Sequence, residues 1–283
     1  MSSWRFTVYT IVISLAVGAA SGVLGTALTS SYLSDYAVAL AELTGPLRRS
    51  QERPHPLPAS YQEAVERLAE SALPSVAEIY QGAPGALGFG EEDRFRIGVV
   101  LTGDGWVAVQ ASSAGPFSLK GANARIRGQM FEIAQSVYDG ATRTIFVKVD
   151  AAGLPVAAFG KGREMQTGDQ AFLAFGPASF ASVRLIAHRW PGAALVSSDE
   201  PNRFLQVDRE AAIGDILFNL NGEVVAIARA DGAFLPMEAL QPSLRSLLEH
   251  QRVTRPTLGV RYLDVAHAVQ ASDTLTRSLA QGA

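Results

Sequence analysis

The chain has 283 residues, 48% of them apolar, which is enough to fill the cores of more than one domain. Its formal net charge of −3 arises from 27 acidic and 24 basic residues, and the basic residues are scattered rather than gathered as nucleic-acid binding requires. The chain lacks cysteine, which excludes disulfides, thiol nucleophiles and cysteine-ligated zinc, and its four histidines (His55, His188, His250 and His267) show no metal-ligand spacing. We therefore expect no metal, no cofactor and no nucleic-acid partner.

The first element is an apolar run over residues 6–28, which carries no charge and is long enough to cross the ~30 Å bilayer core as a helix. Arg5 precedes the run, whereas Asp35 and Glu42 come first after it. The positive-inside bias therefore predicts a cytoplasmic tail over residues 1–5 and a main domain outside the cytoplasm. A cleaved signal peptide stays open as the alternative, although its apolar core usually has only 7–15 residues.

Small residues recur every four positions within this run, at Ser14, Gly18, Gly22 and Thr26. Such a stripe lets the backbones of two membrane helices approach closely. Small residues are also simply common in membrane spans, so the pattern leaves helix self-association and plain composition both open.

A polar and then proline-rich stretch over residues 29–59 predicts an extended tether that holds the following domain away from the bilayer. Ser60 and Glu63 then form a capping-box pattern for a helix start. We expect this helix to end at about Ala72, because Pro74 cannot continue it.

From Val76 onward the apolar residues occur in short runs separated by Gly, Asp and Asn, which predicts an all-β barrel or sandwich. Asp104-Gly105 and Asn221-Gly222 are expected as hairpin turns, because both dipeptides tolerate positive φ. A final amphipathic helix is expected over residues 236–250. The expected strands are Val76–Tyr80, Ile97–Leu101, Trp106–Gln110, Met130–Ser136, Ile145–Val149, Val156–Phe159, Gln170–Phe175, Ser182–His188, Arg203–Val207, Ile216–Asn219 and Val224–Ala228.

Six stretches from Leu73 to the C-terminus resemble, in order and spacing, the HtrA/Deg family of chymotrypsin-fold serine proteases. The most recognisable is Leu217-Phe-Asn-Leu-Asn-Gly-Glu-Val-Val-Ala-Ile227, which is similar to the strand pair after the family's nucleophile loop. The others are Ile97–Val107 (the hairpin before the catalytic histidine), Asp139–Asp150 (the strand with the catalytic aspartate), Leu154–Gly160 and Gln166–Pro177 (the start of the second barrel), and Arg255–Val260 (the start of a PDZ domain).

The resemblance implies two perpendicular six-stranded barrels with a Ser-His-Asp active site in the cleft between them. In this sequence Ser112 stands at the position of the histidine, Arg143 at that of the aspartate and Ile213 at that of the serine. Ile213 has no nucleophilic atom, Ser112 cannot take a proton near neutral pH as imidazole does, and Arg143 is a cation where the mechanism needs an anion. All three chemical roles of the triad are therefore expected to be lost.

The loop around the nucleophile position is altered as well, over Ala211, Ala212, Gly214 and Asp215. Ala211 and Asp215 replace glycines whose backbone freedom shapes the family's oxyanion hole. The loop is also about three residues shorter than the spacing that the resemblance implies. A degenerate oxyanion hole is therefore expected.

Three residue groups could carry other chemistry. Ser112-Ser113 is a candidate substitute nucleophile, but no base lies near it in the sequence. Asp208 and Asp215 could pair as carboxylates, and we favour a turn residue and an exposed loop acid instead. His188, at a strand end, is favoured as a structural histidine.

These observations favour a membrane-anchored pseudoprotease with a trypsin-like domain over residues 60–254 and a partial PDZ domain over residues 255–283, which is about a third of a full one. The resemblance implies a trimer that binds unfolded or peptide clients, so we expect a binding, scaffold or regulatory subunit in extracytoplasmic protein quality control. An endopeptidase that works with unorthodox residues and a purely structural module remain the alternatives.

Overall fold

The computed structural model describes residues 58–82, 88–112, 118–190 and 195–263, all within the second of two compact units, Arg49–Ala283. The predicted membrane span with Ser14, Gly18, Gly22 and Thr26, nearly all of the tether, and residues 264–283 of the partial PDZ domain lie outside the described residues. No helix in the described part of the chain is long and apolar enough to cross a membrane.

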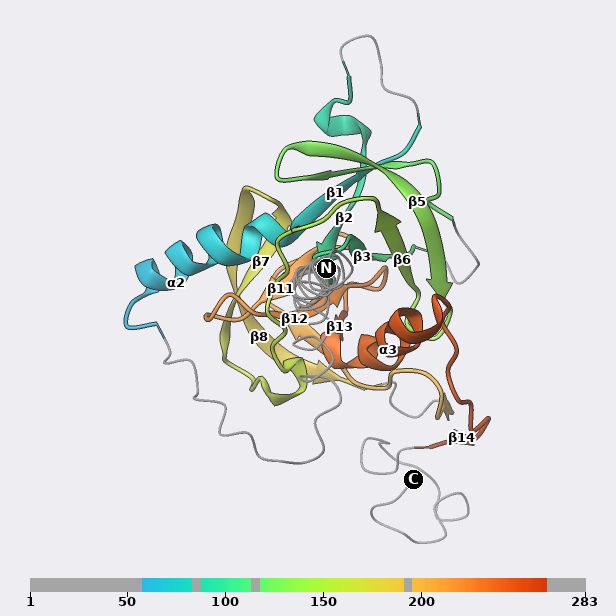
Figure 1. Cartoon of the computed structure of the whole chain (residues 1–283). Helices are drawn as coiled ribbons and strands as arrows, with labels where there is room; N and C mark the ends of the chain where they lie inside the picture. Colours follow the sequence, from blue (N-terminus) through green and yellow to red (C-terminus); the bar gives the residue numbers. More distant parts are fainter. Residues whose placement is uncertain (1–57, 83–87, 113–117, 191–194, 264–283) are drawn as a thin grey trace, which may run out of the picture. The chain divides into compact units, whose positions relative to one another are not determined.

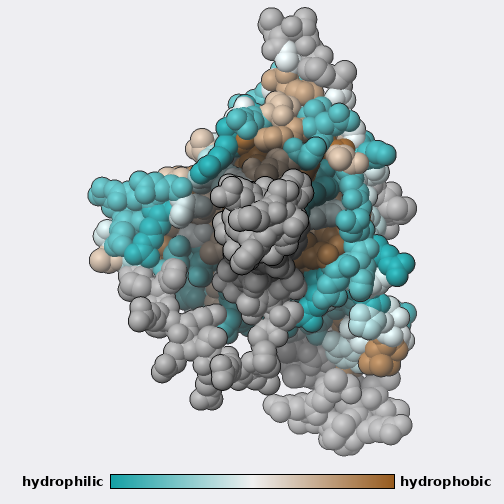
Figure 2. All heavy atoms as spheres, viewed as in Figure 1, coloured by the Kyte–Doolittle hydropathy of each residue, from teal (hydrophilic) through white to brown (hydrophobic). Residues whose placement is uncertain are grey.

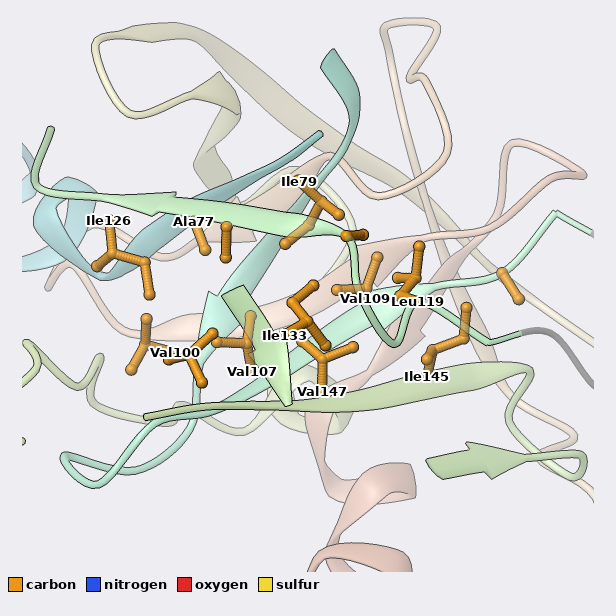
Figure 3. Close-up of a cluster of buried hydrophobic side chains, with 14 residues drawn as sticks. Ala77, Ile79, Val100, Val107, Val109, Leu119, Ile126, Ile133, Ile145 and Val147 are labelled. Carbon is orange, nitrogen blue, oxygen red and sulfur yellow. The ribbon is translucent and has the colours of Figure 1, made fainter. Parts of the chain in front are cut away.

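The first half of the described chain forms a closed six-stranded antiparallel barrel (Figure 1). Its strands are β1 (Val76–Tyr80), β2 (Arg94–Val100), β3 (Trp106–Gln110), β4 (Asn123–Ile126), β5 (Gln129–Asp139) and β6 (Thr144–Val149), in the order β1-β2-β3-β6-β5-β4. Its core consists mainly of β-branched side chains, and Figure 3 shows Ile79, Val109 and Ile133 among those that point into the barrel. Burial of these side chains is the main favourable contribution to the barrel's stability.

The second half forms another closed six-stranded barrel, in the order β10-β13-β12-β11-β7-β8. Its strands are β7 (Gln170–Gly176), β8 (Ser179–Arg189), β10 (Phe204–Val207), β11 (Ile216–Phe218), β12 (Val224–Ala228) and β13 (Phe234–Pro236). Its core is built from aliphatic side chains around the fully buried Phe234. A separate two-stranded sheet joins β9 (Val196–Ser197) to β14 (Arg261–Tyr262).

Two helices flank the barrels. α2 (Tyr61–Arg67) continues as a π-helical turn over Leu68–Ala72 and a 3₁₀ turn over Leu73–Ser75, and α3 (Gln241–His250) follows a 3₁₀ turn over Met237–Leu240. Two further 3₁₀ turns span Glu91–Asp93 and Gly162–Glu164. The predicted cap of α2 is present, because Ser60 Oγ accepts the Glu63 amide at 3.1 Å, although the Glu63 carboxylate accepts the amide of Ala59 rather than that of Ser60.

Most of the predicted strands are confirmed, with one clear error. Val156–Phe159 is not a strand: this connection between the barrels touches a sheet only through a parallel bridge from Phe159 to Val224. The physical reason is that Pro155 offers no backbone N–H, and that the bonds of Ala158 and Gly160 to the sheet both go to Val224, which makes a single bridge rather than a ladder. Strands β4 and β13, by contrast, were not predicted.

The surface seen in Figure 2 is largely hydrophilic over α2 and along β5. A small hydrophobic patch appears beside β14 (Figures 1 and 2). Just before β14, Leu258 is 76% exposed and Val260 is 46% exposed. Scattered exposed apolar side chains of this kind are normal in a folded domain.

Candidate functional site

Ser112 and Arg143 lie side by side at one end of the first barrel. Ser112 follows β3, Arg143 precedes β6, and the Ala111 amide donates to the Arg143 carbonyl at 2.8 Å. The buried side chain of Gln110 reinforces this link, because its Nε2 donates to the carbonyls of Thr142 and Arg143, each at 3.0 Å. Arg143 has a φ of 56°, an uncommon conformation for a residue with a side chain. The hydrogen bonds from the Ala111 amide and from Gln110 Nε2 to the Arg143 carbonyl stabilise this conformation.

Ile213 lies in a tight turn between β10 and β11. The Asp215 amide donates to the Ala212 carbonyl at 3.1 Å, which leaves Ile213 and Gly214 as the central pair of the turn. Gly214 has a φ of 95°, and a Cβ at this position would lie 2.9 Å from the Ile97 carbonyl oxygen on β2. The turn therefore packs directly against the first barrel.

Arg229 of the second barrel lies near both the turn that carries Ile213 and Arg143 of the first barrel. It follows Ala228, whose carbonyl accepts the Gly214 amide at 2.9 Å, and its guanidinium lies 4.3 Å from the ring centroid of Phe204. Burial lowers the pKa of Arg229, the charge of Asp231 opposes this shift, and the charge of Arg143 adds to it. Arg143 of the first barrel thus lies close enough to the second barrel for its charge to act there.

The structure therefore brings the three triad-matched positions, Ser112, Arg143 and Ile213, to the region where the two barrels meet. Ser112 is exposed, while Arg143 and Ile213 are half-buried. An alcohol, a guanidinium and an alkyl chain do not include the imidazole and the carboxylate of a Ser-His-Asp triad. Ser113 of the candidate substitute pair lies outside the described residues.

His188 does not belong to this region's chemistry. On β8, one ring nitrogen, Nε2, lies 2.8 Å from the Met165 carbonyl oxygen, and the other, Nδ1, accepts from Arg203 Nε at 3.3 Å. Both nitrogens have hydrogen-bond partners, as expected for a structural histidine.

Asp215 differs from the sequence prediction of an exposed loop acid, because only 7% of it is exposed. Its Oδ2 accepts the Ala212 amide at 2.8 Å, which closes the turn around Ile213. Burial raises the pKa of the Asp215 carboxyl, and the Ala212 hydrogen bond and the charges of Arg94 and Arg209 oppose this shift. Asp208 binds a different partner, the Arg184 amide at 2.9 Å, so the two carboxylates have separate structural roles.

A cavity of about 350 Å³ opens beside this turn. It lies between β2, the end of β7 and the turn that carries Ile213, so residues of both barrels line it. The lining residues are Arg94, Phe95, Arg96, Ile97, Phe175, Ala212, Ile213 and Asp215. Sequence reasoning missed the two arginines, although their i, i+2 spacing on β2 places both side chains on one face of the strand.

No protein-family model matches the chain, and no curated protein matches it. Solved structures do. The HtrA-type protease AlgW with a decapeptide is 20% identical, covers 79% of this chain and 76% of its own, and has a TM-score of 0.52. A variant of AlgW with a tripeptide is also 20% identical, with coverages of 79% and 73% and a TM-score of 0.55. At identities this low, the comparison shows the fold alone. This chain has the trypsin-like double-barrel fold of the HtrA-type proteases, as its motifs predicted.

Proposed function

We propose that this chain is a pseudoprotease that keeps the fold of HtrA-type proteases and does not hydrolyse peptides. The observation that carries the proposal is the set of residues at the three positions that the chemistry needs, Ser112, Arg143 and Ile213. Removal of any one member of such a triad is already severe, since the three groups act as a unit. Here all three are replaced by residues that cannot take over their roles.

The electrostatics of the cleft support the same proposal. A working triad needs an anion that stabilises the imidazolium formed during proton transfer. This cleft instead has Arg143 at the acid's position, with the positive charge of Arg229 nearby. Two neighbouring cations disfavour any protonated base, because like charges shift the equilibrium toward its neutral form.

The role that fits a folded but inert barrel pair is binding. AlgW and its variant were solved with a decapeptide and a tripeptide, and we propose that this chain likewise engages peptides or unfolded segments as a scaffold or regulatory subunit. We also propose that residues 6–28 anchor it as a single-pass membrane protein with the barrels outside the cytoplasm. In this setting it would form homo- or hetero-oligomers, with relatives that retain the triad, in extracytoplasmic protein quality control.

The decisive experiment is a casein-degradation assay with the purified full chain, beside an active HtrA-type protease. We expect no cleavage above a buffer blank. A matched variant, Ser112→Ala with Ser113→Ala, should be indistinguishable from the unmodified chain. Cleavage that co-purifies with the chain and falls in this variant would overturn the proposal and establish an endopeptidase with unorthodox residues.

The scaffold role has its own test. The full chain is mixed with a purified, active HtrA-type protease, and complex formation is followed by analytical ultracentrifugation while casein turnover is measured. We expect a mixed oligomer with altered turnover. Separate sedimentation of the two proteins, together with unchanged turnover and no binding of casein peptides, would leave only a structural module.

A further inference from the structure

The wall of the interbarrel cavity includes a guanidinium for which the described residues provide no ion-pair partner. Arg96 lines the cavity from β2, and its Nε is buried without a hydrogen-bond partner, one of three such buried side-chain atoms among the described residues. Its Nη1 donates to the Phe95 carbonyl at 2.6 Å, and the guanidinium lies 4.6 Å from the centroid of the Phe95 ring. None of the ion pairs found in the described residues includes Arg96.

An unpaired N–H of this kind is unfavourable. Burial lowers the pKa of the Arg96 guanidinium, yet an arginine side chain stays protonated in proteins, so the charge remains in the cavity wall. A buried donor without an acceptor loses its hydration and receives nothing in return. A carboxylate in the cavity would give the Arg96 guanidinium the charge partner that none of the described ion pairs provides.

The other charges around the cavity leave it positive. Arg94 lines it as well and donates to the buried Glu78 carboxylate at 3.1 Å, while Arg209 lies 5.7 Å from the ring centroid of Phe175. The one carboxylate in the lining, Asp215, already accepts an amide of its own turn. Because Arg94 is already paired with Glu78, Arg96 is the lining cation without an ion-pair partner among the described residues, which favours a ligand with a single negative charge over a dianion.

The rest of the wall is apolar. Phe95, Ile97, Phe175 and Ile213 supply aromatic and aliphatic surface around the two arginines. The volume lies at the small end of the range for ligand sites, about 300–1,000 Å³, which suits one or two residues of a peptide. Planar guanidinium groups match the geometry of carboxylates in particular.

We propose that this cavity binds a carboxylate carried on an apolar group, as at the end of a peptide, with Arg96 as the anion-binding residue and Phe175 and Ile213 as the apolar wall. The proposal deepens the binding role and rests on it, since it names the ligand chemistry of the same cleft. The carboxylate has two sources in a peptide, the C-terminus and an acidic side chain. The isoleucine that replaced the nucleophile thus becomes part of a binding surface.

The test is isothermal titration of the full chain with three probes. These are acetyl-Ala-Ala-Phe with a free carboxylate, its C-terminal amide, and acetyl-Ala-Asp-Phe amide. We expect the free acid to bind at least tenfold more tightly than the plain amide. Recovery of binding by the Asp-containing amide would assign the site to acidic side chains as well, and its failure would assign the site to C-termini. Equal affinity for the acid and the plain amide would overturn the proposal.

Variants locate the binding. Arg96→Met should weaken binding of the free acid at least tenfold, whereas Arg184→Met, the same change on exposed β8, should leave it unchanged. Ile213→Trp fills the cavity without altering its charge and should also abolish binding. Unchanged binding in both cavity variants would refute the site. A cooperative thermal unfolding transition shows whether each variant is folded. If Arg96→Met does not fold, the Ile213→Trp variant and the comparison of the acid probe with the plain amide still test whether the cavity binds a carboxylate.

The casein assay on the same preparation separates this proposal from the proposed function. Binding of the acid probe without casein cleavage supports both. Absence of both binding and cleavage overturns only the carboxylate site. Binding together with casein cleavage that falls in the Ser112→Ala, Ser113→Ala variant overturns only the pseudoprotease assignment.

Discussion

Replacement of Arg255 by alanine should destabilise the first barrel strongly, although Arg255 lies more than 100 residues beyond it in the sequence. Arg255 Nη2 donates to Asp139 Oδ2 at 2.8 Å, at the end of β5, and the side chains are 17% and 2% exposed. The same carboxylate oxygen accepts from Thr142 Oγ1 at 2.6 Å and from Ser243 Oγ at 2.7 Å. This cluster attaches α3 and the following segment to the loop that carries Arg143.

The magnitude follows from the burial of the carboxylate. Removal of one partner of a buried ion pair costs about 3–5 kcal/mol, because the other charge stays buried and uncompensated. Asp139 keeps three donors, Thr142, Ser243 and the Ala141 amide, so we expect the lower end, about 3 kcal/mol. For a domain of this size that corresponds to a fall of about 6–12 °C in the melting temperature.

The assay is thermal unfolding followed by circular dichroism. Lys161→Ala is the matched control, because it removes a cation from the Lys161–Glu164 ion pair, whose side chains are 58% and 71% exposed. It should change stability by less than about 1 kcal/mol. In an Asp139→Asn background, Arg255→Ala should be far less harmful. The reasoning is refuted if Arg255→Ala lowers the melting temperature no more than Lys161→Ala does.

Two further changes test the backbone and the buried acid. Gly105→Ala should destabilise by more than about 2 kcal/mol, because the φ is 110° and a Cβ would collide with the Val149 carbonyl oxygen. Gly153→Ala, with a φ of 68° and open space around the site, should cost only about 1–2 kcal/mol. Equal melting temperatures of the two variants would contradict this reasoning. Asp215→Asn keeps an acceptor for the Ala212 amide and removes the charge. Because burial raises the pKa of Asp215 in the folded state, its stabilising contribution is present below the ordinary carboxyl pKa and is lost as pH rises through the folded value. The variant should therefore gain melting temperature relative to the unmodified chain at pH 7 but not at pH 3, and a pH-independent difference would refute the burial argument.

The fold was largely predictable because many strands are short, continuous apolar runs that end at turn-forming residues. β3 and β12 match their predicted bounds, and the turn at Asp104-Gly105 joins β2 to β3 as expected. β4 and β13 have four and three residues, which is too short for a period of two to stand out. The final helix begins later than predicted, at Gln241, because the preceding residues form β13 and a 3₁₀ turn.

The candidate site was predictable only in part. The motifs gave the positions of Ser112, Arg143 and Ile213, since these are fixed by neighbouring strands. Arg96 and Arg229 matter to the site because they are partly buried by the fold. No local pattern in the sequence predicts this burial. Asp215 was misjudged for the same reason, because its burial depends on contacts that the turn makes with β2.

The turn around Ile213 shows which of its residues the fold itself requires. Gly214 remains glycine at a position where a side chain would collide with the Ile97 carbonyl, so packing of the turn on β2 explains it without any catalytic role. Asp215, by contrast, stands where the resemblance implies a glycine and supplies from its own carboxylate the hydrogen bond that holds the turn closed. Ile213 directly precedes these two residues and meets neither requirement. An isoleucine at this position is therefore compatible with the fold, because the residues that shape the turn are its neighbours.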